Sequence, residues 1–270
     1  MVTLGHINYL NCLPVHSGIL LNKVPFNGKI VKGTPKHLNQ LLEKGEIDIS
    51  PSSSVEIVKG HFIVPGLSIS SKTDVQSIVL FTKVPLNTLK KGKILISSHS
   101  STSSLLLKII FKELYNAQPN FKIFSPENKP IDNEIVGILH IGDIALEYNL
   151  NNTLSADFPY KYDLASIWYE AYNLPFTFAL WQVPITSISK DGLKDAIEAL
   201  HKSYDFYLKN QLYTLKAFVK DYQIAPERIL AYWDRLDYTL TKNHIDSLKL
   251  FFKLLKKHGF IEKVPTFNFI

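Results

Sequence analysis

Short apolar runs alternate with amphipathic helical segments along the first two thirds of the chain. The first run, residues 2–10, is apolar enough for an interior strand of a parallel sheet. Pro14 follows it and suits the first turn of a helix, where a missing N–H costs nothing. Asn11 therefore lies between a predicted strand and the helix that follows it. Ligands of open α/β sheets bind at that edge, so the position bears on function as well as on fold.

The same pattern predicts the other elements. Residues 34–45 carry a complete helix signature, with Thr34 as N-cap, Pro35 at the first helical position and Gly45 as the stop. Further strands are expected at residues 28–34, 46–50, 75–83, 93–97, 121–125, 134–141 and 175–183. Helical segments are expected at residues 14–21, 103–115, 144–148 and 162–174, and then four times from near residues 192, 211, 226 and 241, with Gly259 ending the last.

This layout predicts two α/β lobes. The strands at residues 75–84 and 177–184 are the best candidates for the crossings between them. Residues 84–183 would then be an inserted α/β lobe, and residues 1–83 and 184–270 a discontinuous α/β lobe with a helical C-terminal tail. The expected fold class is α/β, a two-lobed type II periplasmic-binding-protein-like fold with a ligand cleft between lobes.

Composition narrows the class of protein. A chain of 270 residues that is 46% hydrophobic can bury a substantial core. The single cysteine, Cys12, excludes an intrachain disulfide framework and a multi-cysteine metal site. No apolar window reaches the length of a membrane span and the N-terminus does not read as a secretory signal, so we expect a cytoplasmic protein with no membrane partner. The lysines behind the net charge of +6 are scattered, which favours a solvated surface over nucleic-acid binding.

Four loops that lead from predicted strands into helices carry the candidate site. Because the carboxyl ends of the strands share one edge, we expect the loops to converge on one cleft, where helix N-termini favour anions. With only two arginines in the chain, hydroxyl groups and backbone amides would have to hold such an anion. The candidate binding residues are Ser52, Ser53, Ser101, Thr102, Ser103, Gly142 and Asp143. Taken singly, each hydroxyl and Asp143 is more often a helix cap than a ligand contact.

Other candidates for chemistry favour structural roles. The nine histidines form no metal-like pair on a helix, and no metal or cofactor is expected. No G-x-S-x-G nucleophile elbow is present, which argues against a hydrolase triad. Cys12 favours a small buried apolar role over a nucleophilic one. Structural roles are also favoured for His6, His99, His140, Trp168, Trp181 and Trp233.

Several spaced blocks resemble one family. They are "GHINYLNCLP", "GTPKHLNQLLEKGEIDISPSSSVE", "SSHSSTSSLLL", "HIGDIAL" and "YDLASIWYEAYNLPFTFALWQV". In this order they resemble the chorismate dehydratases of the futalosine route to menaquinone. The resemblance implies a cytoplasmic enzyme that dehydrates chorismate, a small dicarboxylate, to 3-[(1-carboxyvinyl)oxy]benzoate.

The resemblance also bears on the mechanism. In the family the substrate's enolpyruvyl carboxylate is thought to remove the C3 proton before the C4 hydroxyl leaves. Asn11 would then be the catalytic residue that orients a carboxylate or the departing hydroxyl, although by itself it could equally be a turn-forming amide. Two alternatives stay open: the dihydroxynaphthoate synthase of the same pathway, which shares the fold, and a non-catalytic solute-binding protein.

Overall fold

Strand pairing between distant segments divides the chain into two units. The computed structural model describes residues 1–125 and 134–270. Unit 1 comprises Met1–Ser70, Thr177–Thr241 and Pro265–Ile270, and unit 2 comprises Ser71–Phe176 and Lys242–Val264. Among the described residues, no helix combines the length and the apolar character needed to cross a membrane.

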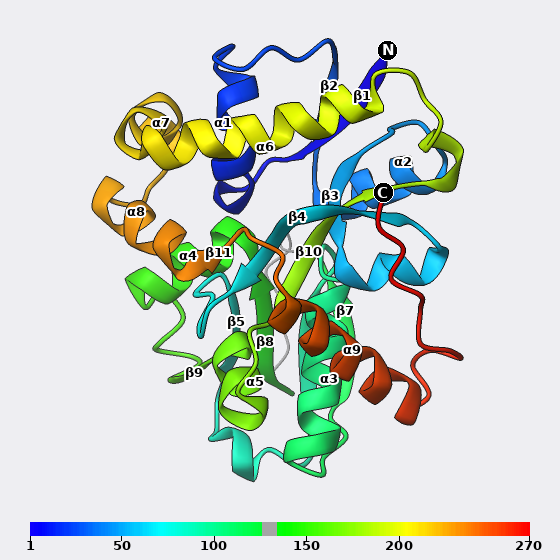
Figure 1. Ribbon diagram of the computed structural model, residues 1–270. Helices are drawn as coiled ribbons and strands as arrows, with labels where there is room; N and C mark the ends of the chain where they lie inside the picture. The colour runs from blue at the N-terminus through cyan, green and yellow to red at the C-terminus, as the bar shows by residue number, and fades with distance from the viewer. Residues whose placement is uncertain (126–133) are drawn as a thin grey trace. The chain divides into compact units, whose positions relative to one another are not determined.

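Unit 1 contains two sheets (Figure 1). Strands β1 (Val2–Ile7) and β2 (Gly28–Gly33) pair in parallel, and an isolated parallel bridge joins Leu4 of β1 to Ile49. The second sheet has the order β11–β4–β10–β3, with bounds Leu236–Asp237, Phe62–Ser71, Thr177–Val183 and Ser50–Ser53. Strand β10 lies antiparallel to both of its neighbours β3 and β4.

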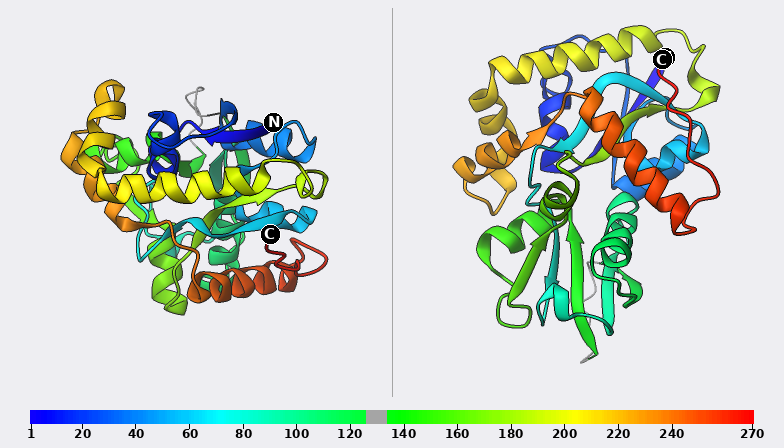
Figure 2. Two further views of the ribbon diagram at one scale, coloured as in Figure 1. Left: turned by 45° about the horizontal axis from the view of Figure 1, so that its top comes forward. Right: turned by 60° about the horizontal axis from the view of Figure 1, so that its bottom comes forward.

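The helices of unit 1 pack on these sheets and on one another. They are α1 (Leu13–Leu20), α2 (Pro35–Glu43), α6 (Leu193–Lys209), α7 (Gln211–Phe218) and α8 (Pro226–Arg235), with 3-10 turns η1 (Leu10–Cys12), η2 (Ser54–Lys59), η4 (Ile185–Ser187) and η5 (Val219–Asp221). Helices α1 and α6 lie side by side (Figures 1 and 2). A Cβ atom on Gly18 would lie 2.8 Å from the Cα of Ser203, so the absence of a side chain at Gly18 permits this contact.

Unit 2 is built on one mixed sheet with the strand order β7–β6–β8–β5–β9. The bounds are Asn120–Phe124, Lys93–Ser97, Ile135–Ile141, Ile78–Thr82 and Tyr160–Asp163. Its helices are α3 (Thr102–Leu114), α4 (Gly142–Asn151), α5 (Leu164–Tyr172) and α9 (Lys242–Lys257), with the turn η3 (Leu86–Thr88). Trp168 of α5 is fully buried, packs against Phe176 and Phe251, and donates its indole N–H to Ser247 at 2.9 Å.

Most predicted elements are confirmed. Helix α2 begins after Thr34, whose hydroxyl accepts the N–H of His37, and ends before Gly45, which has a positive φ of 70°. The four expected C-terminal helices are α6, α7, α8 and α9. Proteins with this order of elements belong to the α/β class that the alternation predicted.

Three features differ from the expectation. Strand β5 pairs with β8 and β9, so residues 71–83 lie with unit 2, and β10 pairs with β3 and β4, so residues 177–183 lie with unit 1. Helix α9 packs on α3 and so belongs to unit 2 rather than to the first lobe. Strand β4 was not predicted, and β3 lies at residues 50–53, beyond most of the expected strand at 46–50.

Candidate functional site

Asn11 lies in the 3-10 turn η1, which begins three residues after the end of β1 at Ile7. The N–H of Tyr9 donates to the carbonyl of Ile7 at 2.8 Å, and the N–H of Cys12 donates to the carbonyl of Tyr9 at 3.0 Å. Trp233 holds the turn from α8 through a 2.8 Å bond from its indole N–H to the carbonyl of Leu10. Within the described chain the buried Oδ1 of Asn11 has no hydrogen-bond partner. A buried acceptor without a donor costs about 1–3 kcal/mol, so a ligand hydroxyl or N–H would stabilise this end of β1.

Two buried imidazoles lie on either side of this turn. Nδ1 of His6 on β1 and Nδ1 of His16 on α1 are 3.0 Å apart, and the indole N–H of Trp181 donates to Nε2 of His16 at 3.0 Å. Burial lowers the pKa of His6 to about 3 and that of His16 well below its usual value, so both rings are neutral. Cys12 is fully buried, as its predicted apolar role requires, and burial raises the pKa of its thiol to about 12.

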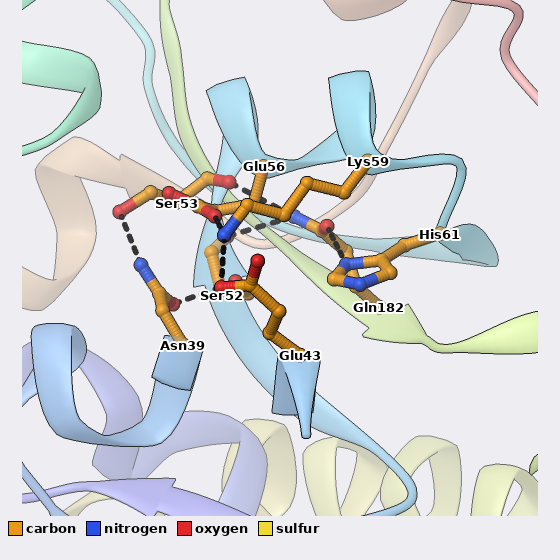
Figure 3. Close-up of polar contacts among 8 residues, drawn as sticks. All are labelled: Asn39, Glu43, Ser52, Ser53, Glu56, Lys59, His61 and Gln182. Carbon is orange, nitrogen blue, oxygen red and sulfur yellow. Dashed lines mark hydrogen bonds and ion pairs between the residues drawn. The ribbon is translucent and has the colours of Figure 1, made fainter. Parts of the chain in front are cut away.

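Ser52 and Ser53 are the last two of the four residues of strand β3, and their polar groups are held within unit 1 (Figure 3). The hydroxyl of Ser52 donates to Oδ1 of Asn39 on α2 at 2.6 Å, and Nδ2 of Asn39 donates to the hydroxyl oxygen of Ser53 at 3.4 Å. Nε2 of Gln182 on β10 donates to the carbonyls of Ser52 and Ser53 at 3.2 and 2.9 Å. The hydroxyl hydrogen of Ser52 is therefore used inside the protein, whereas Ser53 only accepts from Asn39 and keeps its own hydrogen to donate.

A second layer of polar contacts braces the same strand (Figure 3). Nδ1 of His61 lies 3.1 Å from Oε1 of Gln182, which makes Nδ1 the donor because an amide oxygen can only accept. Lys59 on η2 pairs with Glu43 of α2 at 2.6 Å and with Glu56 at 2.7 Å. These contacts tie α2, η2 and β10 to β3 and so restrict the positions that Ser52 and Ser53 can take.

The N-terminus of α3 carries the hydroxyl cluster of unit 2. Ser101 is the N-cap residue but makes no side-chain cap bond, so the common capping role does not account for it. Thr102 and Ser103, the first two residues of the helix, are buried. The hydroxyl of Ser100 is buried and has no hydrogen-bond partner among the described residues. Exposed N–H groups and the helix dipole favour an anion at such a helix end.

Helix α4 begins with Gly142, directly after β8. Gly142 has a positive φ of 71°, which a side chain disfavours, and its N–H donates to the carbonyl of Ser77 at 2.8 Å. Asp143 lies in the first turn, where a carboxylate is stabilised by the helix dipole. His140 on β8 is packed edge-on against Phe124 and Tyr148, and burial lowers its pKa to about 4. This supports a structural role for His140.

A model of the family described as menaquinone biosynthesis matches residues 2–257. The chain belongs to this family. A protein of Thermus thermophilus called chorismate dehydratase is 29% identical over 197 residues, which are 66% of this chain and 68% of that protein. A Campylobacter jejuni protein of the same name is 28% identical over 260 residues, covering 93% of this chain and 96% of the relative.

Solved structures agree with the expected fold of this menaquinone-biosynthesis protein. Protein AF1704 of Archaeoglobus fulgidus aligns with a TM-score of 0.78 at 17% identity, covering 96% of this chain and 98% of that one. The periplasmic aliphatic sulphonate binding protein SsuA of Escherichia coli aligns with a TM-score of 0.63 at 13% identity, covering 98% and 94%. At these identities the likeness shows the fold alone, which is periplasmic-binding-protein-like.

The structure divides the predicted site residues of this family member between the two units. Unit 1 holds Asn11, Ser52 and Ser53, and unit 2 holds Ser101, Thr102, Ser103, Gly142 and Asp143. Within unit 1 the ends of β1 and β3 are neighbours because the bridge from Leu4 to Ile49 joins their segments. Within unit 2 the hydroxyl cluster follows β6 and Gly142 follows β8, and these two strands are paired in parallel. Convergence of all four loops on one cleft stays a prediction.

Sequence reasoning singled out neither Ser100 nor His16, and it gave Trp181 a packing role without its hydrogen bond. Ser100 belongs to the same hydroxyl run as Ser101, and its buried, unpaired oxygen emerges only from the fold. The bond between Trp181 and His16 joins residues 165 positions apart, which no local pattern indicates.

Proposed function

We propose that the protein is a chorismate dehydratase, a carbon–oxygen lyase of menaquinone biosynthesis. The observation that carries the proposal is the match to a relative of that name along 93% of this chain. The reaction removes the C3 hydrogen and the C4 hydroxyl of chorismate as one water and leaves the aromatic ring of 3-[(1-carboxyvinyl)oxy]benzoate. We place the reaction in the cytoplasm and assign it no cofactor.

Asn11 is the residue that we assign to the reacting groups. Its Oδ1 is buried and unpaired within the described chain, so it needs a hydrogen-bond donor. Of the two groups that Asn11 could orient, the C4 hydroxyl can donate and a carboxylate cannot. We therefore assign Oδ1 to the departing hydroxyl, and Nδ2, a donor, to a neighbouring carboxylate.

The base of the reaction is the substrate's own enolpyruvyl carboxylate in this proposal. The imidazoles near Asn11 support this assignment: Nε2 of His16 is occupied by Trp181, and Nδ1 of His6 faces Nδ1 of His16. Cys12 is a thiol held neutral by burial. Since aromatisation supplies much of the driving force, holding the substrate in a reactive geometry is the main task left to the protein.

Neutral donors would bind the two carboxylates. The candidates are Ser53 in unit 1 and Ser101, Thr102 and Ser103 at the N-terminus of α3 in unit 2, where the helix dipole adds to the hydroxyl bonds. Ser52, Gly142 and Asp143 stay candidate contacts, although Ser52 and Gly142 already donate their hydrogens within the protein. The carboxylate of Asp143 would repel a dianion unless it faces the C4 hydroxyl.

Mass spectrometry of purified protein incubated with chorismate tests the proposal. A product lighter than chorismate by one water supports it. Unchanged chorismate, with binding intact, would favour a solute-binding protein. Formation of a dihydroxynaphthoate product from that synthase's own substrate, without turnover of chorismate, would favour the dihydroxynaphthoate synthase of the pathway.

A further inference from the structure

Trp181, His16 and His6 form a hydrogen-bonded chain whose direction can be worked out atom by atom. The indole nitrogen of Trp181 is a donor only, so Nε2 of His16, 3.0 Å away, must accept and carries no hydrogen. The single hydrogen of the neutral His16 ring is then on Nδ1. Nδ1 of His6 lies 3.0 Å from that atom and must accept it. The hydrogen of the neutral His6 ring is consequently on Nε2.

The chain also fixes the charge of both rings. A second proton on His6 would have to enter Nδ1, which already faces the N–H of His16. A second proton on His16 would have to enter Nε2, which faces the N–H of Trp181. Both positions are closed by a donor, so neither histidine can act as a general base without breaking the chain.

The same geometry decides against a metal ion at this place. His6, Cys12 and His16 have ligand atoms within 4.8 Å of one another, and all three residues are buried. A metal on Nδ1 of His16 would move that hydrogen to Nε2 and direct it at the N–H of Trp181. The Trp181 bond therefore favours the hydrogen-bonded pair over a metal site.

The chain of hydrogen bonds leaves one donor over, the N–H at Nε2 of His6. No residue of the described chain accepts this hydrogen, and His6 as a whole residue is 4% exposed. Lys32 lies opposite His6 in the register of β1 and β2, and its positive charge contributes to the low pKa of His6. A donor beside an ammonium group suits an acceptor that carries negative charge.

We propose that His6 donates its Nε2 hydrogen to a carboxylate of the substrate, and that His16 and Trp181 are positioning residues that hold His6 in the donor tautomer. The contact lies on β1, the strand that leads into the turn of Asn11, and the proposal rests on the proposed function. The proposal assigns one substrate carboxylate to unit 1. The first arginine of that unit along the chain is Arg228, so no guanidinium group comes from the segment that carries His6.

Long-range proton–nitrogen NMR spectra of the wild-type protein test the tautomers without any substrate. The expected result is hydrogen on Nδ1 of His16 and on Nε2 of His6, with no change when zinc is added. Hydrogen on Nε2 of His16 would overturn the assignment. Zinc-dependent shifts of both rings would replace it with a metal site.

Binding of chorismate to variants tests the contact. His6→Leu removes the donor and should weaken binding about tenfold or more, while His6→Gln can accept from His16 and donate to the ligand and should stay within about threefold of wild type. Unchanged binding by folded His6→Leu would overturn the proposal.

Trp181→Phe and Trp168→Phe form a matched pair for the positioning role. Both tryptophans are fully buried and each donates one indole hydrogen bond, but only Trp181 contacts His16. Trp181→Phe should weaken chorismate binding and give a mixture of His16 tautomers, and Trp168→Phe should do neither. Equal loss of chorismate binding in both variants would show a merely structural effect. This pair of variants tests the proposal if His6→Leu fails to fold.

If wild-type protein binds no chorismate, both the proposed function and the carboxylate contact are contradicted. The NMR spectra still determine the tautomers of His6 and His16 in that case.

Discussion

The hydroxyl of Ser52 donates to Oδ1 of Asn39 at 2.6 Å and so joins β3 to α2 inside unit 1. Ser52→Ala leaves that buried amide oxygen unpaired and should lower the free energy of unfolding by about 1–3 kcal/mol. Ser53 makes only a 3.4 Å contact with the same amide, so Ser53→Ala should cost less stability. Urea unfolding of both variants measures the difference. A larger loss in Ser53→Ala would contradict the assignment of these hydroxyls.

Thr102 is the first residue of α3, in the hydroxyl cluster assigned to a substrate carboxylate. Thr102→Ala should weaken chorismate binding by about 1.5–3 kcal/mol, the size of a hydrogen bond to a charged group, with little change in melting temperature. Ser104→Ala is the control, because the Ser104 hydroxyl donates to the carbonyl of Ser101 at 2.7 Å within the same turn. Normal binding by Thr102→Ala together with a loss of about 1 kcal/mol or more of stability would identify Thr102 as a structural residue.

Asp163 joins two segments of unit 2 through backbone N–H groups. Its Oδ1 accepts from Ala165 and Ser166 as the N-cap of α5, and its Oδ2 accepts from Val75 and Gln76 at 3.0 and 2.5 Å. Asp163→Ala loses both pairs of hydrogen bonds and should lower the free energy of unfolding by about 2 kcal/mol or more.

The matched control is another N-cap, Thr34, which makes a single bond at 3.4 Å. Thr34→Ala should cost about 0.5–1 kcal/mol in the same denaturation assay. Equal losses in the two variants would show that the contacts to Val75 and Gln76 contribute nothing.

The buried histidine pair should make stability depend on pH. The pKa of His6 is about 3 in the folded protein and near 6.5 when unfolded, so the unfolded chain binds the extra proton first. This contribution to stability is complete above pH 6.5 and is lost as the pH falls from there toward 3. Between pH 8 and pH 5 the loss from His6 alone should be about 2 kcal/mol.

Urea unfolding of wild type and His6→Gln at both pH values isolates this contribution. Asp163 acts in the opposite direction, because burial raises its pKa to about 6, but it is common to both proteins and cancels in the comparison. The stability difference between wild type and His6→Gln should therefore shift by about 2 kcal/mol toward the variant at pH 5. A difference that is constant with pH would mean that His6 is not buried neutral.

Local signals predicted those parts of the fold that local physics decides. Thr34, Pro35 and Gly45 mark helix α2 because capping and φ preferences act within a few residues. The boundaries of the two units differ from the predicted lobe boundaries because they depend on which distant strands pair. Strand β5 pairs with β8, and β10 pairs with β3. Strand β4 contains Pro65 and Gly66, two residue types that are rare within strands, and they obscured its pattern in the sequence.

For the candidate site, the sequence predicted which residues to consider but not the hydrogen bonds that they make. The sequence predicted that Asn11 lies between a strand and a helix, but β1 already ends at Ile7 and Asn11 lies in the turn η1. The unpaired state of its Oδ1 follows from three-dimensional packing. The capping alternative for Ser101 was reasonable and the structure shows no such bond. The tautomers of His6 and His16 depend on Trp181, which approaches from a strand far along the chain.

Turnover of chorismate by wild type, Asn11→Ala and Asn11→Asp tests the central claim most directly. The measurement is formation of 3-[(1-carboxyvinyl)oxy]benzoate at saturating chorismate, with folding checked by circular dichroism. We predict product from wild type and about a hundredfold less from folded Asn11→Ala, because the reacting groups lose their orientation. Asn11→Asp should also lose most activity, since a carboxylate there repels the dianionic substrate. Near-normal turnover by Asn11→Ala would assign the residue to the turn alone, and no product from wild type would contradict the dehydratase assignment itself.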